Sequence, residues 1–285
     1  MRSRYLLNIA LLLILAILVM LVVFEPGKHV EPPPELITSL KPQAIQQIRL
    51  HTPRIADMEL EKQGTQWLIR SPLQARANNA RIENILAITE AVSLTRYPLS
   101  GLDLAQLGLA DPHYTLQLDQ VELRFGGTES LQLNRYLQLA DRVHLINDRY
   151  SYLLQGSAED FIDPQLLTAG ETLQALSLPT VELRLANTQW QVVGSPEQPS
   201  ADRINTLVDN WRHARAARVT PLQQPASGDT IRIELGNTAR PLVYVLSRTD
   251  NEIILSQPEL ALSYHFPLSS GEALLNLPPP PTSNE

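Results

Sequence analysis

Two stretches of this sequence carry the same pattern, so the folded part of the chain must build a similar unit twice. The first copy contains QIRLHT (47–52), MELEKQGTQWLIRSP (58–72) and ARIENILAITEAV (80–92), and the second contains TVELRLANTQWQVVGSP (180–196) and DRINTLVDNWRHA (202–214). The tryptophans, the Ser-Pro pairs and the Arg-Ile pairs of the two copies are offset by 122 to 124 residues. Two copies indicate a duplicated pair and not a solenoid.

Apolar residues at helical spacing predict one amphipathic helix in each copy, within 80–92 and 202–214. Alternating apolar and polar residues predict strands after each helix, at 115–119, 121–125, 135–139 and 142–146, then at 231–235, 242–246, 252–256 and 262–266. Short connections favour antiparallel sheets. The predicted fold class is therefore α+β, a duplicated unit of antiparallel strands with one amphipathic helix each. Residues 148–161 are predicted to form a connecting helix.

The run from Tyr5 to Phe24 is apolar except for Asn8, and as a helix it would span about 30 Å. Arg2 and Arg4 precede it, so the positive-inside rule predicts a cytoplasmic N-terminus and a periplasmic location for the rest of the chain. The alternative is a cleaved signal peptide, whose apolar core is shorter, ~7–15 residues, and ends at a small-x-small site. The residues after Phe24 offer no such site, which favours an uncleaved single-pass anchor in a bacterial inner membrane.

These patterns divide the chain into six segments. They are a cytoplasmic N-terminus (1–4), a transmembrane helix (5–24), a proline-rich spacer (25–35), a first α+β repeat (36–165), a second α+β repeat (166–277) and a disordered tail (278–285). An extended spacer of that length would lift the folded part ~30 Å from the bilayer.

Composition excludes several kinds of chemistry. The chain has no cysteine, which rules out thiol catalysis, thiolate metal sites and a lipid anchor on an N-terminal cysteine. Its formal net charge of −7 gives no electrostatic footprint for nucleic acid, so nucleic acid is not expected as a partner.

Acidic, histidine and tryptophan side chains are the candidates for a site. Asp57, Glu59 and Glu61 alternate along one predicted strand, a pattern that fits either a hard cation or, as we favour, a solvated face. Trp67 and Trp190 hold equivalent positions and are interpreted as core residues, with sugar stacking as the alternative. The six histidines are His29, His51, His113, His144, His213 and His265, and their spacing shows no metal-binding pattern.

Two further features have structural interpretations. Gly126 and Gly127 resemble a phosphate loop only superficially, and a hairpin turn is the predicted reason for them. Arg81 and Arg203 open the two predicted helices at matching positions, where bracing of each repeat is favoured over an anion site. The sequence therefore predicts no catalytic, metal or cofactor-binding residue and no cofactor, and it leaves any ligand-binding residues unknown.

Longer stretches resemble a known family. The stretches LEKQGTQWLIRSP, YPLSGLDLAQLGLADPHYTLQL (97–118) and LRFGGTESLQLNRYLQLADRVHLI (123–146) are similar to the bacterial family called domain of unknown function 4340. The resemblance covers nearly the whole folded region, and its most specific parts are LGLADP and RFGGT. It implies an envelope accessory protein, with some members encoded near gliding-type ABC transporter components. No functional residues are established for the family, so none are carried over.

The function expected from these features is a non-enzymatic interaction module in the periplasm, tethered to the inner membrane through residues 5–24. Its expected partner is a membrane protein or another component of an envelope complex, such as an ABC transporter. The alternatives are a binding module for cell-wall glycan or another envelope ligand, and an enzyme whose site assembles between the two repeats.

Overall fold

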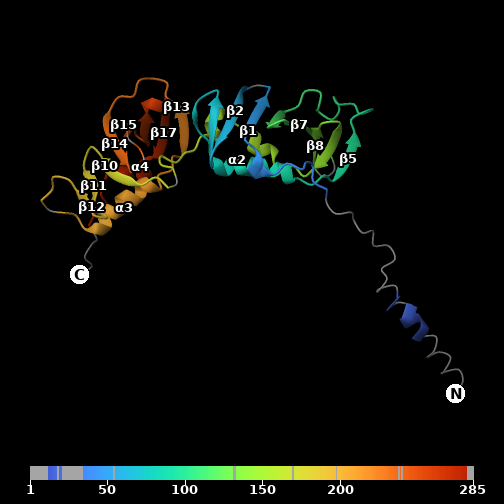
Figure 1. Ribbon diagram of the computed structural model, residues 1–285, viewed down its shortest axis with the longest axis horizontal. Helices are drawn as coiled ribbons and strands as arrows, with labels where there is room; N and C mark the ends of the chain where they lie inside the picture. Colours follow the sequence, from blue (N-terminus) through green and yellow to red (C-terminus); the bar gives the residue numbers. More distant parts are fainter. Residues whose placement is uncertain are drawn as a thin grey trace, which may run out of the picture.

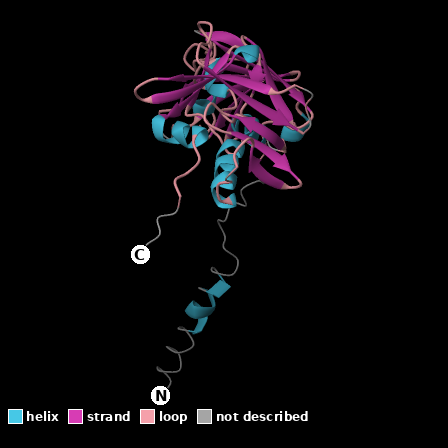
Figure 2. Ribbon diagram, turned by 90° about the vertical axis from the view of Figure 1, so that its left-hand side faces the viewer, coloured by secondary structure: helices cyan, strands magenta, loops and turns pink. Residues whose placement is uncertain are grey.

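Two antiparallel sheets lie side by side, with the helices gathered along one side of both (Figures 1 and 2). The computed structural model describes residues 12–17, 19–20 and 35–280, with the exception of residues 54, 131–132, 169, 197, 237 and 239. The fold is α+β and consists mostly of strands, so the predicted class is confirmed at this level.

The first sheet has nine strands in the order β4-β3-β2-β1-β6-β7-β8-β9-β5. Its strands are β1 (Gln47–Thr52), β2 (Ile55–Gln63), β3 (Gln66–Ser71), β4 (Ala75–Arg76), β5 (Thr95–Pro98), β6 (Tyr114–Leu118), β7 (Val121–Thr128), β8 (Arg135–Leu139) and β9 (Arg142–Ile146). Helix α2 (Asn79–Leu86) lies between β4 and β5 in the sequence, and the 3-10 turns are η1 (Pro42–Ala44), η2 (Ala87–Glu90), η3 (Ser151–Leu154) and η4 (Ala158–Phe161).

The second sheet has eight strands in the order β12-β11-β10-β14-β15-β16-β17-β13. Its strands are β10 (Leu173–Ser177), β11 (Glu182–Ala186), β12 (Gln189–Val192), β13 (Arg218–Pro221), β14 (Asp229–Leu235), β15 (Leu242–Arg248), β16 (Glu252–Gln257) and β17 (Leu262–Pro267). Helix α3 (Ala201–Arg212) precedes β13, turn η5 (Pro258–Leu260) precedes β17, and helix α4 (Leu268–Leu275) follows it.

The two sheets share one connectivity. In the first sheet, β1 to β3 form a meander, α2 follows, β5 lies at the far edge, and β6 to β9 fill the sheet between β1 and β5. The second sheet repeats this order with β10 to β12 as the meander, then α3, β13 at the far edge, and β14 to β17 between β10 and β13. All strand pairs are antiparallel, as predicted. We refer to β1–β9 with α2 as the first unit and to β10–β17 with α3 and α4 as the second.

Each repeated helix covers the core face of its sheet because its apolar residues form one stripe. Helix α2 buries Ile82, Ile85 and Leu86, and its N-cap residue Asn78 accepts a hydrogen bond from the backbone N–H of Arg81 at 3.3 Å. Helix α3 buries four residues, namely Ile204, Leu207, Val208 and Trp211. Both predicted helices are confirmed. Residues 87–90, at the end of the first, form a 3-10 turn.

The helix predicted at residues 148–161 was wrong. The segment forms two separate 3-10 turns, η3 and η4, and Gly156 lies between them with a φ of +103°. A residue in that conformation cannot continue a right-handed helix. A capping box of Ser157 and Asp160 then starts the second turn.

A short segment, residues 161–166, lies between the edges of the two sheets. On one side, the N–H of Asp163 donates to the carbonyl oxygen of Arg76 at 2.8 Å. On the other, the N–H of Ala216 donates to the carbonyl oxygen of Pro164 at 2.9 Å. This connecting segment therefore behaves as a shared strand and joins the two units into one body.

Side chains strengthen the same junction. The Nη2 atom of Arg76 donates to the carbonyl oxygen of Gln165 at 2.5 Å, and its Nη1 donates to the hydroxyl of Thr168. The buried hydroxyl of Tyr244 donates to the carbonyl oxygen of Leu166 at 3.2 Å, and burial raises the pKa of that phenol. Arg76 of the first unit and Tyr244 of the second thus hold the connecting segment from both sides.

The predicted transmembrane helix, residues 5–24, lies largely outside the described residues. The part that the structure describes, residues 12–17 and 19–20, is helical and exposed. Among the residues described, none of the helices combines the length and the apolar character needed to cross a membrane.

Candidate interaction site

The two sheets differ at the edge next to the strand that carries the repeated tryptophan. Trp67 in β3 and Trp190 in β12 hold equivalent positions, since β3 and β12 are each the third strand of their unit. In the first sheet β4 covers β3, whereas in the second sheet β12 is itself the last strand. The same structural edge is covered in one unit and open in the other.

The edge of β3 is completed by the chain itself. The N–H of Trp67 donates to Oδ1 of Asn79 at 3.0 Å, and its carbonyl oxygen accepts the N–H of Ala77 at 2.8 Å. Ala75 of β4 pairs with Ile69 farther along the strand. The outward backbone groups of β3 are therefore satisfied, as buried backbone groups must be.

The second unit lacks the residues that would build such a cover. Five residues, 73–77, separate the Ser-Pro pair from the helix N-cap in the first unit, but only three, 197–199, do so in the second. One of these is Pro199, which has no backbone N–H to donate to a neighbouring strand. The shorter loop explains why the described residues of the second unit include no counterpart of β4.

The side chain of Gln198 makes the hydrogen bonds of a neighbouring strand at one residue of β12, Val192. Oε1 of Gln198 accepts the backbone N–H of Val192 at 2.8 Å, and Nε2 of Gln198 donates to the carbonyl oxygen of Val192 at 3.0 Å. In an antiparallel sheet, residues two apart direct their backbone groups to the same side, so Trp190 also directs its N–H and carbonyl outward. Within the described part of the chain, no strand pairs with this edge.

An open groove of about 610 Å³ adjoins the end of β12. Its lining is mixed: apolar residues such as Leu178, Val181, Val192 and Leu277 lie beside the polar residues Thr180, Glu182 and Ser195. At the opposite end of the molecule, β5 ends in Pro98, and Arg96 of β5 is paired with Glu35. The edge at β12 therefore combines outward backbone groups with a neighbouring groove that contains aliphatic side chains, which makes it the candidate interaction site.

The most specific sequence motifs pack against each other in the first unit. Gly126 and Gly127 lie inside strand β7, so the predicted hairpin turn was wrong. The N–H of Gly127 donates to the carbonyl oxygen of Leu107 at 2.8 Å. A Cβ on Gly126 would lie 2.4 Å from that same oxygen and 2.9 Å from the side chain of Leu109. Glycine is required there because the LGLADP loop crosses the sheet in direct contact with it.

A family model described as a domain of unknown function (DUF4340) matches residues 67–230, more than half of the chain. The chain belongs to this family. No protein of curated function and no solved structure was found to match it. The DUF4340 match begins at Trp67 in β3 and ends in β14, so it crosses the connecting segment and includes both repeated tryptophans. The family likeness indicated by LGLADP and RFGGT is confirmed.

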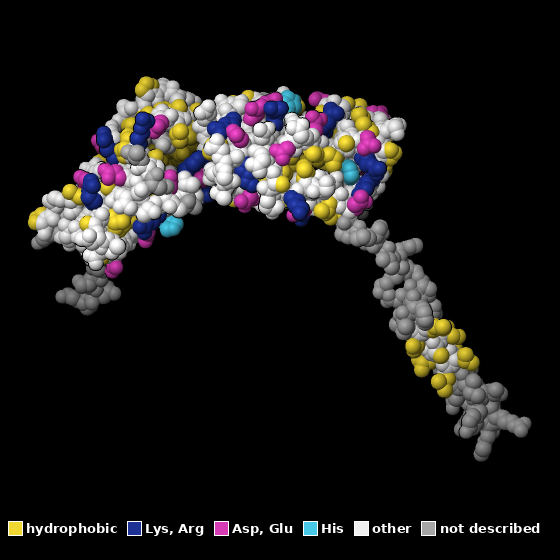
Figure 3. Space-filling view, viewed as in Figure 1, with side chains coloured by type: hydrophobic (Ala, Val, Ile, Leu, Met, Phe, Trp, Pro, Cys, Tyr) yellow, Lys and Arg dark blue, Asp and Glu magenta, His cyan; other side chains and the backbone are white. Residues whose placement is uncertain are grey.

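In this DUF4340 chain the row of carboxylates is a solvated face. Each carboxylate pairs with a basic side chain on a neighbouring strand: Asp57 with His51 at 2.6 Å, Glu59 with Arg49 at 2.9 Å and Glu61 with Arg70 at 2.8 Å. Figure 3 shows basic and acidic side chains next to each other over the first unit. Met58 and Leu60, which alternate with these carboxylates, are buried in the core. No group of three or more His, Asp or Glu residues that could hold a metal ion occurs among the described positions.

The two tryptophans have different environments. Trp67 is only 2% exposed, which confirms it as a core residue and leaves no face for a sugar ring. Trp190 is half-buried and packs against the core from the open edge strand. The missing cover strand accounts for this difference.

Arg81 and Arg203 brace the ends of their units, as favoured from the sequence. Nη2 of Arg81 donates to the carbonyl oxygens of Leu153 at 3.0 Å and Gln155 at 2.5 Å. Its guanidinium lies over the ring of Phe161 at 4.0 Å, and burial lowers the pKa of Arg81. Nε of Arg203 donates to the carbonyl oxygen of Pro278 at 2.6 Å. The backbone carbonyls occupy the positions where an anion would otherwise bind.

We expect Arg81→Met to lower the free energy of unfolding by about 2 kcal/mol, because the carbonyl oxygens of Leu153 and Gln155 lose a charged donor. Arg203→Met is the matched control and should lower the free energy of unfolding less, since the Arg203 side chain donates to one carbonyl oxygen, that of Pro278. Urea unfolding followed by circular dichroism measures both. Equal losses would contradict the role assigned to Arg81.

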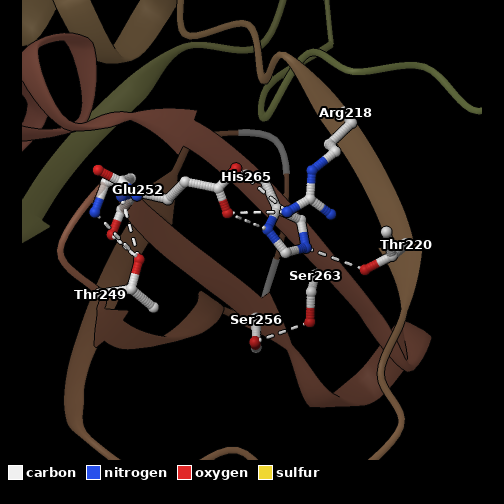
Figure 4. A network of polar contacts seen from close by, with 8 residues as sticks. Arg218, Thr220, Thr249, Glu252, Ser256, Ser263 and His265 are labelled. Carbon is white, nitrogen blue, oxygen red and sulfur yellow. Dashed lines mark hydrogen bonds and ion pairs between the residues drawn. The ribbon is translucent and has the colours of Figure 1, made fainter.

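The structure also reveals a polar network on the second sheet that the sequence did not indicate. Figure 4 shows the carboxylate of Glu252 in β16 facing both His265 and Arg218, with Thr220 on the other side of the imidazole. Oε2 of Glu252 lies 3.1 Å from Nδ1 of His265 and 2.8 Å from Nη2 of Arg218. Nε2 of His265 lies 3.0 Å from Oγ1 of Thr220. The residues come from β13, β16 and β17, so no sequence spacing brings them together.

This network fastens the edge strand β13. Because β13 pairs only with β17, the contact from Arg218 to Glu252 reaches across β17 to the third strand. Beside it, the hydroxyls of Ser256 and Ser263 lie 2.9 Å apart and are buried. A hydroxyl, an imidazole and a carboxylate in a row also occur in nucleophilic sites. Here the charged partner Arg218 engages the carboxylate, and we interpret the set as structural.

The network predicts a pH-dependent contribution to stability. Hydrogen bonds from His265 and Arg218 hold the pKa of Glu252 below its ordinary value. A carboxylate with a lowered folded-state pKa stabilises the fold above its unfolded pKa of about 4.3, and this contribution is lost as the pH falls through the folded-state pKa. Glu252→Gln should therefore be less stable than the unaltered protein at pH 7, and the difference should shrink toward pH 3.

Urea unfolding at a series of pH values measures this difference. Glu234→Gln is the control, because Glu234 lies 3.8 Å from a single basic partner, Arg184, at the exposed surface. A difference for Glu252→Gln that stays constant from pH 7 to pH 3 would show that the lost charge is not its cause.

Proposed function

We propose that this protein is a single-pass, membrane-tethered interaction module of the bacterial envelope, and that its two units arose by duplication of one ancestral unit. Residues 5–24 anchor it in the inner membrane with the N-terminus in the cytoplasm, and residues 36–277 lie in the periplasm. It serves as a non-enzymatic accessory or scaffold subunit of an envelope complex, with an ABC transporter as the favoured kind of partner.

One observation carries the proposal: the sheet edge at β12 stays open while the equivalent edge of the first unit is covered. Natural sheets normally protect such edges, because unpaired backbone groups invite pairing with another chain. An edge that remains open beside a groove with aliphatic side chains in its lining is therefore suited to a partner. The burial of Trp67 removes one of the two stacking faces on which glycan binding was based.

The tether is supported by the chemistry of the N-terminal run. Residues 12–17 and 19–20 are helical and carry apolar side chains with more than half of their surface exposed, among them Leu12 and Leu13 (Figure 3). In water such a helix would leave a large apolar surface unburied, whereas a bilayer would cover it. Arg2 and Arg4 before the run fix its proposed orientation.

The tether is tested by extraction. The full-length protein should stay with the membranes after an alkaline carbonate wash, and a chain that starts at residue 25 should be released into the soluble fraction. An alkaline phosphatase fused after residue 285 should be active, since the proposal places that end outside the cytoplasm. Release of the full-length protein by the wash would overturn the anchor.

The interaction is tested by photocrosslinking in native membranes. A photoreactive amino acid is introduced at exposed positions of residues 36–277, one at a time, and the products are identified by mass spectrometry. A module of this kind should form reproducible adducts with one membrane or envelope protein. Recovery of the protein without an adduct from every position would reject the proposed function.

A further inference from the structure

The open edge at β12 is a place where a strand is missing, and the first unit shows what that strand looks like. β4 runs antiparallel to β3, and the chain continues to Ala77, whose N–H bonds the carbonyl oxygen of Trp67. Ala75 and Ala77 are buried, at 7% and 0% exposure, while Arg76 between them is not. A cover strand at this edge is thus extended, with small apolar residues alternating with a polar one.

We propose that an extended segment of the partner protein adds as a strand to β12 and completes the second sheet. This inference rests on the proposed function and names how the partner is held. The segment lies antiparallel to β12, as β4 does to β3. It accepts the N–H of Trp190 and donates to its carbonyl oxygen, and small apolar residues at alternate positions face the core side. Main-chain hydrogen bonds of this kind supply affinity, and alternate side chains supply specificity.

In the unbound protein, Gln198 satisfies the outward backbone groups of Val192 on β12. Its side-chain amide makes the two hydrogen bonds to Val192 that a strand would make, at 2.8 and 3.0 Å. An incoming backbone amide replaces a side-chain amide of the same chemistry, so the number of hydrogen bonds at Val192 does not fall on exchange. Since Gln198 is exposed, its side chain can turn into solvent when the segment arrives.

The groove beside β12 sets the chemistry of the segment. Its lining by Val181, Val192 and Leu277 suits an aliphatic side chain next to the paired residues. Leu178 and Val193 extend this apolar surface, and Val193 is 46% exposed. The segment therefore carries an aliphatic residue at one end of the small, alternating stretch.

A single segment fits this edge better than a second copy of the chain. Pairing of β12 with β12 of another copy would bring two proline-containing loops, residues 193–199 of each chain, to the same short edge. Both Gln198 side chains would also have to be displaced at once. A partner segment displaces one side chain and meets one loop.

The test introduces a photoreactive amino acid in place of Gln189 or Gln191 in the full-length protein in its native membrane. Both side chains are exposed on β12, two residues apart on the same face. The expected result is that both positions crosslink to one segment of one partner, at residues about two apart and in reverse order. The same amino acid at Leu68, the equivalent of Gln191 in the covered strand β3, is the control and should crosslink only within the chain.

Two variants change the availability of the edge. Replacing residues 196–200 by the first unit's own sequence PLQARAN (72–78) supplies a cover strand, and crosslinking from position 189 should fall at least about tenfold, because the edge is then already paired. Gln198→Ala removes the competing amide, and crosslinking below saturation should rise at least about fivefold, the worth of one of the two neutral hydrogen bonds that this amide makes to Val192. Circular dichroism checks that both variants fold. If the loop exchange does not fold, Gln191→Lys with the label at position 189 replaces it, since lysine protects sheet edges.

Each outcome separates this inference from the proposed function. If labels on other surfaces of residues 36–277 form adducts but labels at positions 189 and 191 form none, strand addition is overturned. The proposed interaction module is still supported in that case. Adducts with a second copy of the chain would also overturn strand addition, because the edge would then be a dimer contact. Adducts at position 189 that persist unchanged when the edge is covered would overturn it as well. The absence of adducts from every position would reject both strand addition and the proposed interaction module.

Discussion

Gly126→Ala is expected to lower the free energy of unfolding by about 3 kcal/mol, the upper range for adding one methyl group to a packed site. The new Cβ would lie 2.4 Å from the carbonyl oxygen of Leu107, and that oxygen is held in place by its hydrogen bond to Gly127. Backbone on both sides of the contact prevents relief by a side-chain rotation. The loop that includes Leu109 must therefore lift from the sheet.

Gly127→Ala is the matched control, one residue away. Its Cβ would meet the same oxygen at 3.5 Å, an ordinary contact, so the loss should stay below about 1 kcal/mol. Urea unfolding of both variants decides the matter, and hydrogen exchange of residues 99–112 locates the damage. Similar losses for the two variants would show that the close approach at Gly126 is not what requires glycine.

Trp211→Ala is expected to cost 3–5 kcal/mol, the usual range for removing a fully buried large aromatic side chain. Trp211 of α3 has no exposed surface, and its Nε1 donates to the carbonyl oxygen of Leu274 in α4 at 2.7 Å. Its ring lies 6.5 Å from that of Tyr244 in the sheet. The side chain thus joins both helices of the second unit to the sheet.

Trp190→Ala serves as the comparison, because Trp190 is half-buried at the open edge. We expect it to cost less than half as much. Trp211→Phe keeps a six-membered ring but loses the hydrogen bond to Leu274, worth about 1 kcal/mol, and leaves a small cavity, so its cost should lie above about 1 kcal/mol and below that of Trp211→Ala. Denaturant midpoints with unchanged m-values measure all three. A larger loss for Trp190→Ala than for Trp211→Ala would contradict the packing described.

Long periodic elements could be predicted from the sequence. The helix over residues 202–214 and the strands near Ile231 and Ile253 have clear apolar patterns, and the structure contains them with ends shifted by at most two residues. Such patterns reflect burial on one face, which is a local property of the sequence.

Short elements could not be predicted in this way. β4 has two residues, and the edge strands β5 and β13 have four each, which is too few for a period. Helix α4 begins directly after β17, and the close approach of its Gly271 to Ile253 is set by packing in space. Residues 148–161 fit a helical pattern because Gly156, which interrupts them, is a single residue within an otherwise plausible run.

The candidate site left one signal in the sequence. The Ser-Pro pairs are offset by 124 residues, but the Arg-Ile pairs that follow are offset by 122. The difference of two residues arises because the loop before α3 is shorter, and this loop has Gln198 and Pro199 where the first unit has a cover strand. Its meaning depends on knowing that residues 75–77 pair with β3, which only the structure provides.

The connecting segment limits how the duplicated halves can behave. Residues 161–166 fill the gap between both sheets, so a cut at any point there removes a strand neighbour from each half. Either unit produced alone without this segment would expose backbone groups that the segment now satisfies. A truncated protein that is meant to contain a single unit should therefore retain residues 161–166 with that unit.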